Sequence, residues 1–232
     1  MLFRSDKPAG WLLVPFSWQR TERNLQAAIA SSIAGGEYWA RSRGLKFLRF
    51  VHRLDGETTG VLLFAKSLGA VQTYSELFES RQMRKTYLAV VRGVPRQTSW
   101  NCRAKLGPDP QMNGRMRVDS RGGKEAETQF LLLQSVGDFS LVEATPVTGR
   151  THQIRIHLRE SGHPVVGDPL YGPGTDESRA GLRRRFPLGL RSIRLTYTDP
   201  FRQRPVDIQA PDERFLRAFG FLQSDPPMTR PG

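Results

Sequence analysis

The chain has 232 residues, 38% of them hydrophobic and 25% charged, which is typical of a globular protein large enough to bury a core. It has one cysteine, Cys102, no apolar run near the roughly 20 residues that span a bilayer, and no signal-peptide pattern, so we expect a cytoplasmic protein with no internal disulfide and no membrane partner. Lysine and arginine total 35 against 22 acidic residues, and the net charge of +13 favours a nucleic-acid partner over a merely solvated basic surface.

Helical and extended patterns follow each other irregularly in the first half of the chain. Residues 21–34 place apolar side chains on one helical stripe, with Thr21 as a possible N-cap, and residues 70–80 show a second stripe. Residues 61–66 form a short apolar run that is typical of a buried strand. Residues 85–93 alternate in a way that predicts a strand with two distinct faces.

The second half of the chain indicates mainly loops and strands. Residues 94–124 are rich in proline, glycine and polar residues, which predicts loops or a short hairpin insertion. Two strands are expected over residues 128–134 and 139–145, joined by a tight turn. After an arginine-rich loop, further strands are expected at 193–198 and near 206–209.

Residues 150–164 fit two structures. Ile154 and Ile156 alternate as they would in a strand. However, Thr151 could cap a helix and Gly162 could end one, with a proline at the usual distance beyond it. Because both ends are marked, we expect a helix here.

The order of these elements predicts the fold class. Strands and helices are mixed without regular βα alternation, which is typical of an α+β fold with a largely antiparallel sheet. The sequence shows no internal repeat and no long linker. We therefore expect one domain over residues 1–220, followed by a disordered tail over residues 221–232.

The segment "FVHRLDGETTGVLLFAK" (50–66) contains the leading candidate for a catalytic residue, Asp55. An aspartate beside a glycine is most often a turn or N-cap residue. However, catalytic residues are often found on loops that a rigid strand holds in place, as the strand after Asp55 would do. Glu57 could form an acid pair with Asp55, although two residues of one turn rarely face each other across a substrate.

Other chemistries have weaker support. The histidine spacings fit no ordinary zinc pattern, so we expect no metal site at His52, His152, His157 or His163. Cys102 has no histidine near it in a recognisable arrangement, which disfavours a thiol nucleophile. No P-loop or dinucleotide-binding glycine pattern occurs. Any catalysis is therefore expected to need no cofactor.

Three blocks of the sequence resemble those of the RluA family of pseudouridine synthases, in the same order and at similar intervals. They are "HRLDGETTGVLLFAKS" (52–67), "RKTYLAVVRG" (84–93) and "GRTHQIRIHLRESGHPVVGDPLYG" (149–172). Residues 6–10, "DKPAG", resemble the family's first block, and residues 195–211 resemble its closing strands. The resemblance therefore covers nearly the whole chain.

The resemblance implies a fold, an activity and three catalytic residues. The fold is a curved, mixed, mainly antiparallel sheet with flanking helices and a central basic cleft. The activity is cofactor-free isomerisation of uridine to pseudouridine in rRNA or tRNA, by a protein that we expect to be a monomer. Asp55 stands where the family has its catalytic aspartate, Tyr87 where a tyrosine stacks on the uracil, and Arg155 where a basic residue pairs with the aspartate.

Further residues of these blocks are expected to contact RNA. Arg53 matches an arginine that helps to fill the gap left by an extracted nucleotide. The others are His52, Lys85, Arg150 and Gln153. The chain departs from the family's pattern at several points. The strand before residues 6–10 is expected to be shortened or missing, and Arg191 stands where a histidine is common, which would alter a substrate contact. We also expect a stand-alone catalytic domain, with no S4-type RNA-binding module before it.

The chemistry of the reaction fits these assignments. Pseudouridine formation breaks the C1′–N1 bond, turns the uracil over and joins C5 to C1′, so the nucleotide must leave the base stack. A carboxylate could attack C1′ as a nucleophile or remove a proton from C2′, and the sequence leaves both routes open. The alternative functions are an RNA-binding protein without activity and an N-glycosylase that lets water capture the sugar.

Overall fold

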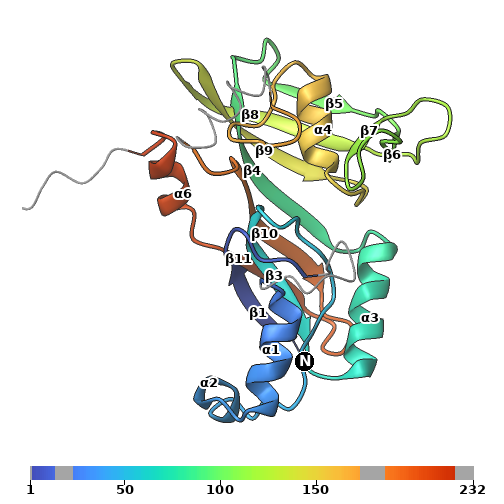
Figure 1. Cartoon of the computed structure of the whole chain (residues 1–232), viewed down its shortest axis with the longest axis vertical. Helices are drawn as coiled ribbons and strands as arrows, with labels where there is room; N and C mark the ends of the chain where they lie inside the picture. Colours follow the sequence, from blue (N-terminus) through green and yellow to red (C-terminus); the bar gives the residue numbers. More distant parts are fainter. Residues whose placement is uncertain (1, 14–22, 173–185, 223–232) are drawn as a thin grey trace, which may run out of the picture.

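The computed structural model describes residues 2–13, 23–172 and 186–222, whose strands form one large sheet and one hairpin (Figure 1). Seven strands of the large sheet follow the order β1-β3-β10-β4-β9-β8-β5, while β2 pairs with β3 and β11 with β10. The strands of this sheet are β1 (Leu2–Lys7), β2 (Arg49–Phe50), β3 (Thr59–Ala65), β4 (Arg84–Arg92), β5 (Ser99–Cys102), β8 (Thr128–Val136), β9 (Phe139–Pro146), β10 (Leu190–Thr198) and β11 (Pro205–Gln209). The hairpin of β6 (Leu106–Pro108) and β7 (Met116–Val118) lies in the segment expected to hold loops or a hairpin.

The sheet is mixed and mainly antiparallel, as the sequence predicted. β3 and β10 pair in parallel, whereas the other named pairs of the described chain are antiparallel. β1 pairs with β3 along its whole length, from Leu2 opposite Ala65 to Lys7 opposite Gly60. The strand that was expected to be shortened or missing at this edge is therefore present, and β1 ends beside the start of β3.

Helices cover both faces of the sheet. They are α1 (Leu25–Ala34), α2 (Tyr38–Arg41), α3 (Leu68–Glu79), α4 (Gln153–Glu160) and α6 (Glu213–Ala218). Successive residues of a strand point to opposite faces. Leu62 and Phe64 of β3 belong to the buried cluster that includes residues of α2 and α4 and against which α1 packs, while Leu63 belongs to the cluster on the α3 side. In Figure 1, α4 lies against β5, β8 and β9, and α3 lies at the other end of the sheet beside β3.

Helix boundaries differ from the predicted ones for local reasons. α1 begins after Asn24, whose side chain accepts a hydrogen bond from Ala27 N at 3.0 Å, while Thr21 lies outside the described residues. α4 confirms the helix expected within residues 150–164. Its N-cap is His152, with φ of 56°, instead of Thr151.

Gly60 lets the start of β3 approach β10 closely. A Cβ atom at this position would lie 2.0 Å from Ser192 O, and its φ of +112° is disfavoured for other residues. Gly60 and Ser192 are opposite each other where β3 and β10 pair in parallel. Only glycine therefore allows β3 to pair this closely with β10 just after the loop that carries Asp55.

The last described residues pack on the sheet. α6, a helix of six residues, was not predicted from the sequence. Next to it, Phe219 and Phe221 are buried against Leu88 and Val90 of β4. Phe221, which was expected to begin a disordered tail, thus belongs to the core. Residues 223–232 and most of the arginine-rich loop (173–185) lie outside the described residues.

Candidate active site

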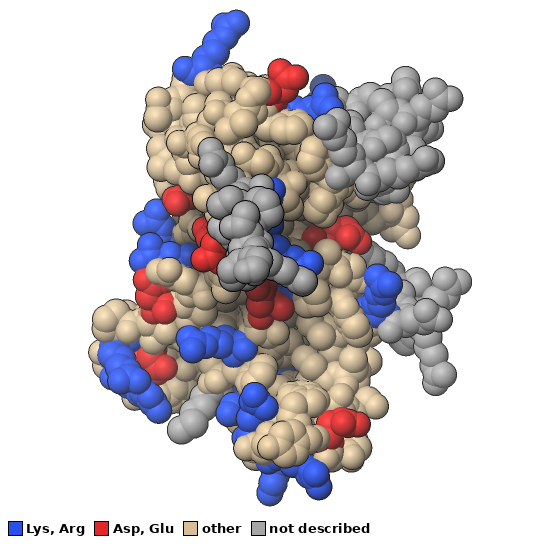
Figure 2. All heavy atoms as spheres, turned by 90° about the vertical axis from the view of Figure 1, so that its left-hand side faces the viewer, with Lys and Arg blue, Asp and Glu red and all other residues tan. Residues whose placement is uncertain are grey.

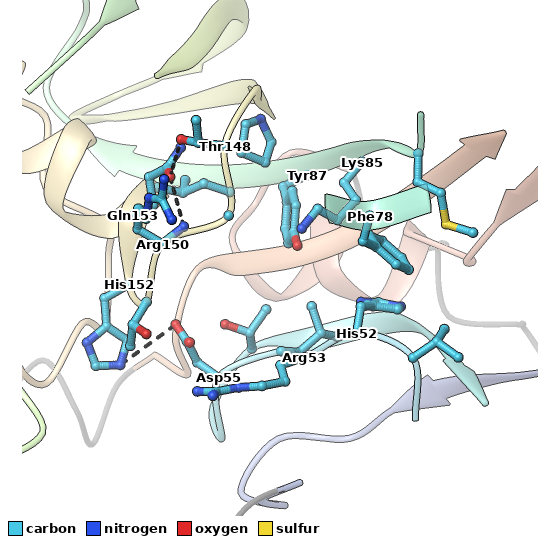
Figure 3. Close-up of a pocket in the computed structure, with 18 of the residues that line it drawn as sticks. His52, Arg53, Asp55, Phe78, Lys85, Tyr87, Thr148, Arg150, His152 and Gln153 are labelled. Carbon is cyan, nitrogen blue, oxygen red and sulfur yellow. Dashed lines mark hydrogen bonds and ion pairs between the residues drawn. The ribbon is translucent and has the colours of Figure 1, made fainter. Parts of the chain in front are cut away.

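A pocket of about 890 Å³ lies where β4, the loop between β2 and β3, α3 and the segment before α4 meet (Figure 3). Its volume is within the range of sites for small ligands, and a nucleotide would fit. Six basic and two acidic side chains line it. They are Arg49, Arg53, Arg81, Lys85, Arg150 and Arg155, with Asp55 and Glu79. The expected central basic cleft is therefore present.

Positive charge is distributed differently on the outer surface. On the face drawn in Figure 2, lysine and arginine side chains form separate groups with acidic and uncharged residues between them. The pocket, by contrast, gathers six basic side chains around one cavity. A polyanion would therefore find a concentrated positive field at the pocket.

Asp55 lies in the loop between β2 and β3, with its side chain 24% exposed at the pocket. Lys7, at the end of β1, holds this loop from within the protein. Its buried Nζ donates hydrogen bonds to the carbonyl oxygens of Gly56 at 2.6 Å and Thr58 at 2.9 Å, and to Pro8 O at 3.0 Å. Burial lowers the pKa of Lys7 to about 8. The sequence predicted the importance of the block at residues 6–10 but not this contact.

Arg155 joins two carboxylates. Its Nη1 donates to Asp55 Oδ2 at 3.3 Å, which confirms that the two residues lie together. Its closer partner is Asp168, which accepts from Nε at 2.7 Å and from Nη2 at 2.8 Å. Asp168 also accepts from the backbone N–H groups of Leu170 and Tyr171, at 2.8 and 3.0 Å. The guanidinium is thus fixed on one side by Asp168 and presents Nη1 to Asp55.

Pairing keeps these buried groups charged. Burial would raise the pKa of Asp168, but the hydrogen bonds and charge of Arg155 and the two N–H groups lower it below its ordinary value. Burial likewise opposes the charge of Arg155, yet Asp168 and then Asp55 raise the pKa of this guanidinium. Asp168 is a functional residue that the sequence reasoning missed, although it lies within the 149–172 block.

Tyr87 projects from β4 into the same pocket. Figure 3 shows its ring pointing from the strand toward the loop that carries Asp55. The residue is only 6% exposed, and burial, helped by the charge of Asp55, raises the pKa of the phenol. The hydroxyl group is therefore neutral at physiological pH, and the ring is held by the sheet.

Three of the residues expected to contact RNA carry charge on the pocket wall. Arg53 is exposed, and Arg150 is half-buried with its Nε donating to Glu125 O at 3.0 Å. Lys85 Nζ lies 5.5 Å from the centre of the Phe78 ring. Burial lowers the pKa of Lys85.

His52 also lines the pocket but is buried. Its Nε2 accepts a hydrogen bond from Leu63 N at 3.2 Å, and its ring centre lies 4.6 Å from that of Phe78. Burial, and secondarily the charge of Lys85, lower the pKa of His52 to about 3. The imidazole is therefore neutral.

Gln153 uses all of its hydrogen-bonding groups inside the protein. Its Nε2 donates to Glu127 O and to Thr128 Oγ1, both at 2.9 Å. Its Oε1 accepts from Thr148 Oγ1 at 2.7 Å and from Arg150 N at 3.0 Å. Gln153 thereby fixes the segment from Thr148 to Arg150 at the rim of the pocket.

His152 and Tyr171 are further residues that sequence reasoning did not assign to the site. His152 Nε2 lies 3.9 Å from Asp55 Oδ2, and its Nδ1 lies 2.8 Å from Tyr171 Oη. The Arg155 guanidinium lies over the Tyr171 ring, 5.0 Å from its centre. Their place in the 149–172 block was the available signal.

The remaining histidines and Arg191 serve other contacts. His157 binds Thr128 Oγ1 and Ala104 O, and among the described residues no cluster of histidine, cysteine and acidic side chains could hold a metal ion. Arg191 does not line the pocket. It donates to Asp6 Oδ2 at 2.6 Å and Pro211 O at 2.7 Å, so it ties β10 to the N-terminal edge of the sheet.

Comparison with known proteins agrees with the geometry. The sequence model of the RNA pseudouridylate synthase family matches residues 5–160, which include Asp55, Tyr87 and Arg155. The chain belongs to this family, and its blocks are those of the RluA-type members.

Individual relatives are similar over different shares of the chain. "Uncharacterized RNA pseudouridine synthase" of Chloroflexus aurantiacus is 45% identical over 136 residues, which are 59% of this chain and 42% of that protein. "Ribosomal large subunit pseudouridine synthase C" of Escherichia coli is 37% identical over 178 residues, which are 74% of this chain and 55% of that protein. The chain thus spans about half the length of the curated relatives that it matches.

Solved structures show the same fold. The structure of "Human RNA Pseudouridylate Synthase Domain Containing 1" superposes with a TM-score of 0.71 at 27% identity, over 96% of this chain and 87% of that one. "Human RNA Pseudouridylate Synthase Domain Containing 4" gives a TM-score of 0.73 at 23% identity, over 95% and 89% of the two chains. The α+β pseudouridine synthase fold is therefore confirmed. No helix among the described residues is long and apolar enough to cross a membrane.

Proposed function

We propose that this protein isomerises uridine to pseudouridine in RNA, with Asp55, Tyr87 and Arg155 as its catalytic residues. One observation carries the proposal: the Asp55 carboxylate is held 3.3 Å from a buried guanidinium, in a basic pocket that the Tyr87 ring also enters. An acid needed only for a turn would not require a buried cationic partner 100 positions away in the sequence.

The residues divide the reaction between them. Asp55 either forms a bond to C1′ or removes a proton from C2′; in both routes the C1′–N1 electron pair leaves with the uracil. The uracil then turns over and C5 bonds to C1′, which breaks the Asp55–C1′ bond in the first route or occurs with return of the proton to C2′ in the second, and the proton on C5 is lost. Tyr87 offers a flat face to the detached base, and such stacking contributes about 1–3 kcal/mol per base. Arg155 places a fixed positive charge 3.3 Å from the Asp55 carboxylate.

We assign contacts with RNA according to how exposed each residue is at the pocket. We propose that Arg53 and Arg150, together with Arg49 and Arg81, contact phosphates, which position an RNA without reading its sequence. Lys85 adds a cationic group deeper in the pocket. We assign His52 and Gln153 a supporting role, since both are buried and hydrogen-bonded within the protein.

The names of the relatives direct the choice of substrate. Because several are ribosomal large subunit enzymes, we propose rRNA as the first substrate to test and tRNA as the second. We also propose that the chain as far as Phe221 acts as one catalytic domain, as a monomer in the cytoplasm. No cofactor is assigned to the pocket.

The test compares Asp55→Asn with Glu57→Gln, an exposed acid two residues away. Pseudouridine is mapped in total RNA from cells that lack the gene and are complemented with each variant. We expect sites that disappear on deletion to return with Glu57→Gln and not with Asp55→Asn. RNA binding and folding of Asp55→Asn should remain nearly unchanged. Full modification by Asp55→Asn would remove Asp55 from its role, and release of free uracil would indicate an N-glycosylase.

A further inference from the structure

The hydrogen bonds of Tyr171 assign the protonation of His152. Tyr171 Oη accepts a hydrogen bond from Met116 N at 3.0 Å and lies 2.8 Å from His152 Nδ1. Within the described parts of the chain, the phenol proton then has His152 Nδ1 as its acceptor. Because Nδ1 accepts, a neutral ring carries its own proton on Nε2.

The second nitrogen of His152 leads to the same assignment. Nε2 lies 3.9 Å from Asp55 Oδ2, the pair marked by a dashed line in Figure 3. An ionised carboxylate only accepts hydrogen bonds, so a lone pair on Nε2 would be repelled by it. Burial lowers the pKa of His152, although the charge of Asp55 opposes this, and the ring is neutral with Nε2–H facing the acid.

The backbone of His152 is held in an uncommon conformation. Its φ of 56° makes it one of three non-glycine residues with positive φ among those described. Although it is the N-cap residue of α4, its side chain makes no capping hydrogen bond. Such conformations persist where the surroundings hold them, and they cluster at functional sites. The imidazole ring of His152 contacts Tyr171 and Asp55 instead of capping the helix.

Both donors near Asp55 converge on one oxygen. Arg155 Nη1 lies 3.3 Å from Oδ2, and His152 Nε2 lies 3.9 Å from the same atom. In the described structure no hydrogen bond to Asp55 Oδ1 is found. The two oxygens of the carboxylate are therefore not equivalent.

We propose that His152 is a positioning residue that, together with Arg155, holds Asp55 by Oδ2 and leaves Oδ1 as the oxygen that reacts with the ribose. This inference rests on the proposed function. When bound RNA excludes water from the pocket, the 3.9 Å contact shortens to a hydrogen bond, which is stronger in the drier site. Tyr171 acts one step further away, by selecting the tautomer.

Two substitutions at position 152 separate this role from a structural one. His152→Asn keeps an amide near Tyr171 Oη and tolerates positive φ, but does not reach Asp55. His152→Gln places an N–H group near the position of Nε2. We expect His152→Asn to lower the single-turnover rate of pseudouridine formation by about 10- to 100-fold, with the Kd for RNA changed less than about twofold. His152→Gln should recover most of the rate.

Nuclear magnetic resonance tests the tautomer without any RNA. Long-range ¹H–¹⁵N spectra distinguish Nδ1–H, Nε2–H and doubly protonated rings, and the His152 signal is the one lost in His152→Asn. We expect the Nε2–H form near neutral pH, and a mixture of tautomers in Tyr171→Phe.

Each outcome decides the inference. A normal rate in His152→Asn beside an active unaltered protein, or an Nδ1–H or doubly protonated ring, would overturn it while leaving the proposed function intact. A low rate that His152→Gln does not recover would reduce His152 to a structural residue. If the unaltered protein forms no pseudouridine in any RNA, the proposed function fails, and the inference fails with it.

Discussion

Both ends of the pocket contain buried charged or polar groups, but these groups have ion-pair partners at one end and none at the other end among the described residues. At the Asp55 end, the guanidinium of Arg155 is paired with Asp168 and Asp55. At the end next to α3, His52 and Lys85 lie against the Phe78 ring, and no ion pair of either is found within the described residues. Among the described residues, buried charged groups therefore have ion-pair partners only at the Asp55 end of the pocket.

The pKa directions follow from this difference. Pairing raises the pKa of Arg155 and lowers that of Asp168 against the effect of burial, so both stay charged. At the α3 end, where neither group has an ion-pair partner among the described residues, burial lowers the pKa of His52 to about 3, so that its ring is neutral, and burial also lowers the pKa of Lys85. The Asp55 end therefore offers fixed charges to the reacting ribose, while the α3 end offers the Phe78 ring and the neutral His52 imidazole, which suit the face of a base.

The largest effect should come from breaking the pairing at the Asp55 end. Asp168→Asn leaves the buried Arg155 without its bidentate partner, and removal of one member of a buried pair costs about 3–5 kcal/mol of unfolding free energy. The single-turnover rate should fall as well, because the guanidinium loses the contact that orients Nη1. Urea denaturation and single-turnover assays measure the two quantities.

Asp207→Asn is the matched control for that experiment. Asp207 pairs with Arg194 at 2.6 Å, but both side chains are largely exposed, and such surface pairs contribute little. We expect almost no change in stability or rate. Equal losses in the two variants would mean that burial does not distinguish the pairs, and the comparison between the two ends would lose its basis.

A smaller effect concerns the unpaired end and appears as pH dependence. Below about pH 6.5 the unfolded chain binds a proton at His52, whereas the folded protein does so only near pH 3. Stability should therefore fall as the pH drops from 7 toward 3, and His52 alone contributes a loss of about 2 kcal/mol at pH 5. In His52→Gln, whose amide oxygen can still accept from Leu63 N, the decline should be shallower. A parallel decline in both proteins would contradict an unpaired, neutral His52.

The sequence predicted the elements that carry the site and the residues that face each other in it. Strand β4 was predicted from its alternation, and α4 from its two marked ends, because periodicity and end signals are local properties. The blocks of the family resemblance placed Asp55, Tyr87 and Arg155 in one pocket, where the structure indeed brings them together. The expected RNA contacts stay predictions.

What the sequence could not give depends on contacts between distant residues. Helical spacing puts Arg155 on one face with Arg159, which is typical of a solvated surface, yet every residue from Gln153 to Leu158 is buried. Lys7 binds backbone carbonyl oxygens, which leave no trace in the side-chain pattern. The contacts of the buried His52 with a backbone N–H group and a neighbouring ring likewise leave no trace in the side-chain pattern.

The smallest expected effect tests whether the rim of the pocket contacts RNA by charge alone. Arg53 is exposed on the pocket wall, whereas Arg204 is exposed on the turn before β11 and does not line the pocket. Removing one phosphate contact lowers the slope of log K against log salt by about 1 and weakens binding uniformly across sequences. We therefore expect Arg53→Ala to reduce both the affinity for RNA and its salt dependence, with the rate at saturating RNA unchanged, while Arg204→Ala alters neither. Filter-binding titrations at several salt concentrations measure the slopes; a slope in Arg53→Ala equal to that of the unaltered protein would remove Arg53 from the RNA interface, because a charge that neutralises a phosphate must release counterions when it binds.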